Sequence, residues 1–156
     1  MLKSPESADV GAWHKYFAMS NNNRAWQLAA MPTRTAAEDQ EMLSTAHAAA
    51  VHWTAVGTPL NVSRANMLLA AVHSLLGPAE LAWSLAEETK KAFDKPDTPA
   101  WETAFVHVFH AHAAAISGRT QPHRDSYASA KAAIASLADP QDRQIVEASF
   151  VQVPSP

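Results

Sequence analysis

The chain has 156 residues, no Cys, and 12 Lys and Arg against 15 Asp and Glu, which gives a formal net charge of −3. The lack of Cys excludes disulfide frameworks, thiolate metal sites and Cys nucleophiles, and the mixed charges give no basic surface for nucleic acid and no polybasic membrane anchor. About a fifth of the residues are Ala, which has the highest helix propensity, and only 4 are Gly. This composition predicts an all-α fold, and the length predicts a single domain over residues 1–156.

The first predicted helix lies within residues 5–31, where apolar residues recur at roughly helical spacing. Ser4 or Ser7 is its expected N-terminal cap. The run from Ser20 to Arg24 contains three successive Asn, whose side chains compete for backbone hydrogen bonds inside a helix. We therefore expect a break or a solvated turn there; the alternative is that the helix holds these amides for binding. No apolar segment typical of a signal peptide is present at this end, which predicts a cytoplasmic protein.

Cap and stop residues divide the next part of the chain into three predicted helices. Thr35 and Glu38 have the spacing of a capping box, and the helix that they open is expected to end at Gly57. Thr58–Pro59 provides a cap and a first turn for the following helix. Gly77–Pro78 ends that helix and begins the fourth, because Gly favours the residue after a helix and Pro favours its first position.

Residues 101–116 are predicted to form the central helix of the fold. Apart from the first turn and three His, this segment is apolar in every direction. A helix without a polar face has to lie between other helices, and this one is too short for a membrane span of about 20 apolar residues. Thr98–Pro99 is its expected cap and Gly118 its expected end. Two further helices are predicted after Gln121–Pro122 and Asp139–Pro140.

These elements amount to about seven antiparallel helices with short connections, so successive helices are expected to pack as neighbours. The pattern indicates helical hairpins. A degenerate first pair covers residues 1–57, a second pair 58–97 and a third pair 98–138, and residues 139–152 form a capping helix. The alternative is a compact helical bundle.

Small residues recur around two of the expected turns. Gly77 and Gly118 each stand between two antiparallel helices, and Thr89 and Ala130 follow them at the same offset. In this respect residues 60–138 resemble the tetratricopeptide repeat, although the unit is longer than the usual one and His123 stands where a small residue is common. The resemblance implies a right-handed superhelix with a concave binding face. The chain also resembles short helical proteins of bacteria.

Eight His make up the most conspicuous set of reactive side chains. His107 and His110 share one face of the central helix, while His47 and His73 stand in the middle of the second and third helices. If these helices face one another, the four imidazoles form a set that suits a divalent transition metal. The alternative is that each His is a neutral, hydrogen-bonded core residue that needs no cofactor.

Amides and guanidinium groups form a second set. Together they suit recognition of a carboxylate or of an extended peptide backbone, whereas the alternative role is in caps and solvated turns. The Trp residues are expected to pack in the core or at helix edges. The residues expected to line a concave peptide-binding face are Asn22, Arg24, Arg64, Asn66, Met67, His73 and His112.

The sequence lacks Ser-nucleophile motifs, Gly-rich phosphate loops and paired carboxylates at catalytic spacing, which disfavours an enzyme. The function that it favours is a non-catalytic helical-repeat module or adaptor that binds a protein segment on its concave face. The alternative function is a His-lined interior pocket for a metal or small ligand, with possible catalysis. A homodimer formed through exposed apolar faces is compatible with either.

Overall fold

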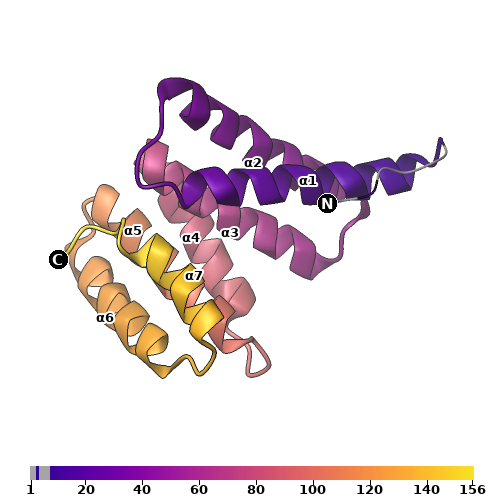
Figure 1. Ribbon diagram of the computed structural model, residues 1–156. Helices are drawn as coiled ribbons and strands as arrows, with labels where there is room; N and C mark the ends of the chain where they lie inside the picture. The colour runs from indigo at the N-terminus through magenta and orange to yellow at the C-terminus, as the bar shows by residue number, and fades with distance from the viewer. Residues whose placement is uncertain (1–2, 4–7) are drawn as a thin grey trace.

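The computed structural model describes residues 3 and 8–156 and folds into α-helices joined by short loops (Figure 1). No strand is present in these residues, which confirms the all-α prediction. The expected caps Ser4 and Ser7 lie outside the described residues, and the prediction is wrong, because Asp9 caps the first helix by accepting a hydrogen bond from the Ala12 backbone N–H. The helices are α1 (Val10–Ala29), α2 (Ala36–Val56), α3 (Pro59–Leu76), α4 (Ala79–Phe93), α5 (Ala100–Ile116), α6 (Thr120–Ser136) and α7 (Pro140–Phe150).

Most of the predicted helix ends are confirmed. Thr35 and Glu38 form the capping box of α2, and Asp139 caps α7 by accepting a hydrogen bond from the Gln141 backbone N–H. The cap predicted for α5 is wrong, because the hydroxyl of Thr98 donates to the carbonyl oxygen of Phe93 at 2.8 Å instead of capping the helix. The loop before α5 is thus closed by Thr98, and α5 begins without a side-chain cap.

Replacement of Thr35 by Ala is expected to lower the free energy of unfolding by about 1 kcal/mol. The substitution removes the acceptor for the Glu38 backbone N–H and leaves the Glu38 carboxylate with only the Thr35 backbone N–H. Urea denaturation measures the difference. Thr33→Ala is the matched control, because Thr33 is exposed in the preceding loop, and a loss as large as that of Thr35→Ala would contradict the capping role.

The expected break in the first helix is wrong, because α1 continues through Ser20–Arg24 without interruption. Asn21 donates its side-chain amide to the carbonyl oxygen of Phe17 at 2.8 Å within the same helix. Ala18 and Ala25, on either side of the Asn run, are fully buried, and Arg24 makes two hydrogen bonds to Glu41 of α2. In a helix, Asn is less favourable than Ala by a few tenths of a kcal/mol, on a propensity scale that spans ~0.7 kcal/mol for ordinary residues. The tertiary contacts outweigh this cost.

Successive helices pack against one another along the whole chain, and α1, α3, α5 and α7 also pack in series. The odd-numbered helices thus follow one another in space, and each even-numbered helix packs on the odd-numbered helices that precede and follow it in the chain. In Figure 1, the α1–α2 hairpin lies at one end of the molecule and α6 and α7 lie at the other. This order of contacts is compatible with helical hairpins that follow one another along the chain.

The prediction that α5 is enclosed is confirmed, since α5 packs on α3, α4, α6 and α7. Phe105 and Phe109 of α5 belong to the larger apolar cluster, which includes Ile134 of α6 and Val146 of α7. A second cluster joins the first three helices around Leu28, Met42 and Leu68. Within the described part of the chain, no helix is both long enough and apolar enough to span a bilayer.

Candidate functional site

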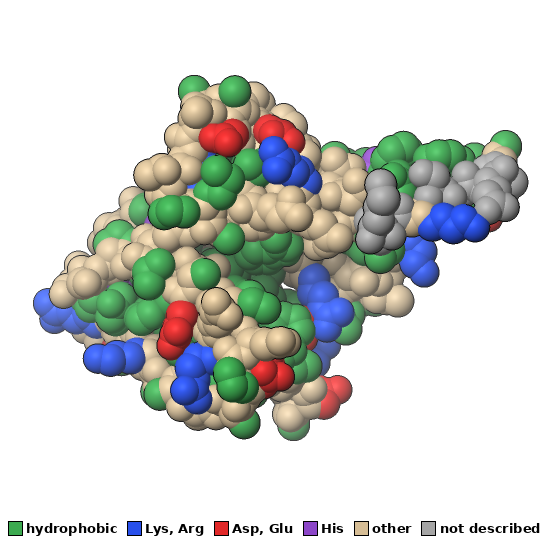
Figure 2. Space-filling view, in the orientation of Figure 1, with side chains coloured by type: hydrophobic (Ala, Val, Ile, Leu, Met, Phe, Trp, Pro, Cys, Tyr) green, Lys and Arg blue, Asp and Glu red, His purple; other side chains and the backbone are tan. Residues whose placement is uncertain are grey.

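A groove of about 640 Å³ runs along the odd-numbered helices. Side chains from α1, α3, α5 and α7 line it, together with Trp53 near the end of α2. Figure 2 shows the surface hollowed between the α1–α2 hairpin and the α6–α7 end, with hydrophobic side chains in the hollow and Lys or Arg side chains at its edge. The groove is open to solvent on one side.

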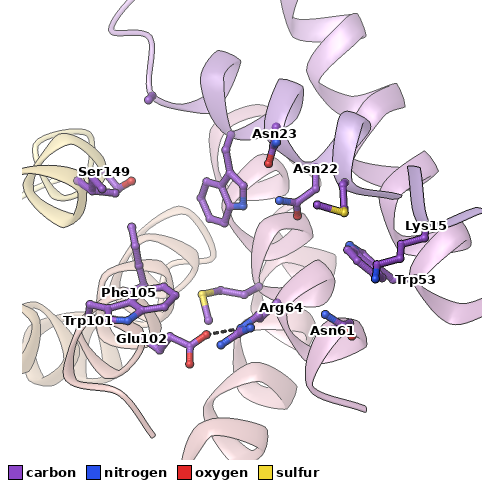
Figure 3. A pocket seen from close by; sticks show the side chains of 15 residues that line it. Lys15, Asn22, Asn23, Trp53, Asn61, Arg64, Trp101, Glu102, Phe105 and Ser149 are labelled. Carbon is purple, nitrogen blue, oxygen red and sulfur yellow. Dashed lines mark hydrogen bonds and ion pairs between the residues drawn. The ribbon is translucent and has the colours of Figure 1, made fainter. Parts of the chain in front are cut away.

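Aromatic side chains form one wall of this groove. Trp101 and Phe105 lie one turn apart on α5, with ring centroids 6.1 Å apart and the rings edge to face. Trp26 of α1 reaches the same wall, 5.8 Å from Phe105, and Met67 of α3 lies buried at the base. Contacts of this geometry hold aromatic rings in fixed orientations and leave a firm apolar surface for a ligand. Figure 3 shows Trp101 and Phe105 side by side on this wall.

Amide side chains form the opposite rim. Asn22 and Asn23 project from α1 into the groove, and neither side chain makes a hydrogen bond to another described residue (Figure 3). Each amide therefore offers both a donor and an acceptor to a ligand. Of the three amides in the Asn run, those of Asn22 and Asn23 thus line the groove on an intact helix, whereas Asn21 donates to its own helix.

The α2–α3 turn brings two further side chains to the rim. Trp53 and Asn61 both line the groove, and Gly57 lies between them in the chain. A Cβ atom on Gly57 would lie 2.6 Å from the Trp53 carbonyl oxygen and 2.9 Å from the Asn61 Cβ, so no larger residue fits without displacing the turn. Gly57 thus permits the close approach that places both side chains on the same rim.

One ion pair lies within the groove. The Arg64 Nε atom donates to the Glu102 Oε1 atom at 2.5 Å, and the dashed line in Figure 3 marks this contact. The Glu102 side chain is 1% exposed and that of Arg64 is 41% exposed, so a buried carboxylate holds a solvent-facing guanidinium. The guanidinium carbon also lies 5.9 Å from the centroid of Trp101, within the range of a cation–π contact.

The groove contains three of the seven residues predicted to line a binding face, namely Asn22, Arg64 and Met67. Arg24 pairs with Glu41 away from the groove, and Asn66 is half-buried on α3 without lining it.

The remaining two predicted binding residues are His. His73 packs against His47, with ring centroids 5.4 Å apart, and its ring contacts the carbonyl oxygen of Gly77 at 3.2 Å. His112 is buried beside Trp26 and Gln152, next to the groove but not in it.

Sequence reasoning missed the aromatic wall and the ion pair. The spacing of Trp101, Phe105 and Phe109 places their side chains on one face of α5, and this regular spacing was the available signal. No comparable signal joins Trp26 to Phe105 or Arg64 to Glu102, since each pair is far apart in sequence.

The four His predicted as metal ligands do not meet in one place. His47 and His73 form one pair, whereas the His110 ring lies between the Ser126 hydroxyl and the Glu87 carboxylate, at 2.6 Å from each. Burial is the main cause that lowers the pKa values of His107 and His110 below the usual value. Across residues 3 and 8–156, no group of three or more His, Asp or Glu is arranged to hold a metal ion.

Comparison with known proteins gives no match for this chain. No protein-family model matches it, and neither a curated protein nor a solved structure is significantly similar to it.

Proposed function

We propose that the protein is a non-catalytic helical-repeat binding module of tetratricopeptide-like type, which receives an extended segment of a partner protein in the groove. The observation that carries this proposal is the combination of an aromatic wall with unpaired amides in one groove of about 640 Å³. This volume lies within the range of about 300–1,000 Å³ typical of ligand sites.

The aromatic wall and the amide rim of the groove suit different parts of a peptide. Trp101 and Phe105 offer a firm apolar surface on which a bulky side chain can be buried. Asn22 and Asn23 offer donors and acceptors together, which an extended backbone requires because each residue carries one N–H and one C=O. The aromatic wall and the amide rim together therefore support binding of an extended peptide.

The packing of the helices also supports the proposal. All four odd-numbered helices line the groove, and of the even-numbered helices only α2 contributes a side chain, Trp53, so the odd-numbered helices present this face to a partner. Gly77 and Gly118 have φ values of +80° and +72°, as expected for Gly at the ends of helices that turn into the next hairpin partner. Stacked hairpins with one uncovered face are the usual form of a solenoid binding surface.

A peptide display experiment tests the proposal. Random peptides of about ten residues, which in extended form cross about 33 Å, are selected on the immobilised full chain. We expect a shared sequence pattern among the selected peptides, and a change in Trp fluorescence on binding, because Trp26, Trp53 and Trp101 line the groove. Selection without any shared pattern would contradict the proposal.

A matched pair of variants locates the binding. Ile145 of α7 lines the groove and is 58% exposed, whereas Leu81 of α4 is 42% exposed and lies outside it. Ile145→Gln is expected to weaken binding of a selected peptide about fivefold, from the loss of roughly 1 kcal/mol of apolar contact, whereas Leu81→Gln leaves it unchanged. Equal affinities for the two variants in a fluorescence titration would place the peptide elsewhere.

A further inference from the structure

The groove carries a local positive charge on a protein whose net charge is −3. Its charged lining residues are Lys15, Arg64 and Glu102, and Glu102 is already paired with Arg64. Within the described residues, Lys15 makes no ion pair. The two cations therefore exceed the one carboxylate, and this excess favours an anionic group in the groove.

The Arg64 guanidinium is held in place before any ligand arrives. Its Nε atom is bound to the buried Glu102 carboxylate, and its carbon lies against the Trp101 ring. The two terminal amino groups make no hydrogen bond to another described residue. A guanidinium presents such donors in a planar fork that matches the two oxygens of a carboxylate. Glu102 acts as a positioning residue, since its buried side chain fixes the guanidinium.

The position of Arg64 in the groove decides which kind of carboxylate fits. In Figure 3, Trp101, Phe105 and Ser149 lie on one side of Arg64, whereas Lys15, Trp53 and Asn61 lie on the other. A bound peptide whose C-terminal carboxylate lay at Arg64 would contact only one of these two groups of lining residues. A segment that runs past Arg64 uses both, with a side-chain carboxylate at the guanidinium.

The groove also differs in charge between its two ends. Beyond Trp101 and Phe105 a second hollow, of about 210 Å³, continues along Ile145 to Asp142 at the start of α7. The carboxylate of Asp142 repels another carboxylate at this end. An acidic residue is therefore favoured near Arg64 and disfavoured near Asp142, with a bulky apolar residue between the two.

We infer that the partner segment is acidic: it carries an Asp or Glu side chain that binds Arg64, next to a bulky apolar side chain that packs on Trp101 and Phe105. Lys15, which lines the same groove, adds to the attraction for the acidic segment. This inference rests on the proposed function and names the chemistry of its ligand. Binding is consequently weakened by added salt, because part of the attraction is between charges that remain partly exposed.

Peptide display also tests this inference, since peptides fused to a coat protein at their C-terminal end have no free C-terminal carboxylate. We expect the selected peptides to share an Asp or Glu at one position beside a bulky apolar residue. A shared pattern without an acidic position would overturn the inference and leave the proposed function standing. The absence of any shared pattern would overturn both.

Variants then identify the cations. For a selected peptide synthesised with an amidated C-terminus, Lys15→Glu is expected to raise the Kd at least fivefold, whereas Lys91→Glu, on the exposed surface of α4 outside the groove, leaves it within twofold. The double variant Arg64→Gln/Glu102→Gln removes the whole ion pair and is expected to raise the Kd at least tenfold. The Glu→Gln or Asp→Asn form of the peptide should bind the wild type and this double variant equally.

Circular dichroism melting checks that the double variant is folded, and Lys15→Glu serves as the test if it is not. An unchanged Kd for the acidic peptide in Lys15→Glu and in the folded double variant would overturn the inference. Binding that requires a free C-terminal carboxylate in synthetic peptides would likewise overturn it, because the ligand would then be a chain end.

Discussion

Phe109→Ala is expected to lower the free energy of unfolding by about 3–5 kcal/mol, the range found when a buried aromatic residue is truncated to Ala. Phe109 is 4% exposed and stacks on Phe105 with ring centroids 5.3 Å apart and an interplanar angle of 11°. Its ring also lies 5.6 Å from that of Trp26, so it connects α5 to α1. Removal of the ring leaves a cavity where these two helices meet.

Urea denaturation followed by circular dichroism measures this loss. Phe17→Ala is the matched control, because the Phe17 ring of α1 is 40% exposed and stacks mainly on Trp13. We expect the control to lose about 1 kcal/mol or less, since it leaves no enclosed cavity. Similar losses for the two variants would contradict the assignment of Phe109 to the core.

Acidification from pH 7.5 to pH 4.5 is expected to cost the fold about 2–3 kcal/mol through His112 alone. Burial, with a smaller contribution from the nearby His123, lowers the pKa of His112 from 6.5 to about 4. Well above pH 6.5 the imidazole is neutral in the folded and the unfolded chain. As the pH falls from 6.5 towards 4, the unfolded imidazole binds a proton that the folded one does not, so the unfolded state gains stability.

The measurement compares urea denaturation of the wild type and His112→Leu at the two pH values. Leu has a similar volume and does not titrate, so the variant should lose about 2–3 kcal/mol less than the wild type on acidification. Gln27→Leu, which adds a Leu at an exposed position of α1 without removing an imidazole, should behave as the wild type does. A wild type and a His112→Leu variant with equal acid losses would show that His112 does not titrate as described.

Local signals in the sequence were sufficient to place most helix ends. The Thr35–Glu38 capping box and the stops at Gly57 and Gly77 depend on residues within one turn of each other, so their chemistry can be read without the rest of the fold. The enclosure of α5 could also be predicted, because a helix without a polar face has only one stable environment.

The continuity of α1 and the make-up of the groove could not be predicted in this way. The Asn run stays helical because Ala18 and Ala25 pack against neighbouring helices, and such contacts exist only in the folded chain. Asn22 and Arg64 were identified from their chemistry. Their meeting with Trp26 and Glu102 depends on the angles between helices, which no local spacing specifies.

A hydrogen bond near the C-terminal end of the chain has a consequence for how the whole molecule denatures. The Gln152 side-chain amide donates to the Ala29 carbonyl oxygen at 2.9 Å, although the two residues are 123 positions apart. A stack of hairpins with contacts only between neighbours can melt from either end, one hairpin at a time. Here the hydrogen bond links the turn after α7 to the C-terminal end of α1. Local unfolding at one end of the chain is therefore coupled to local unfolding at the other end. We therefore expect a single cooperative unfolding transition. The same hydrogen bond limits how far α1 and α7 can move apart when a ligand binds in the groove.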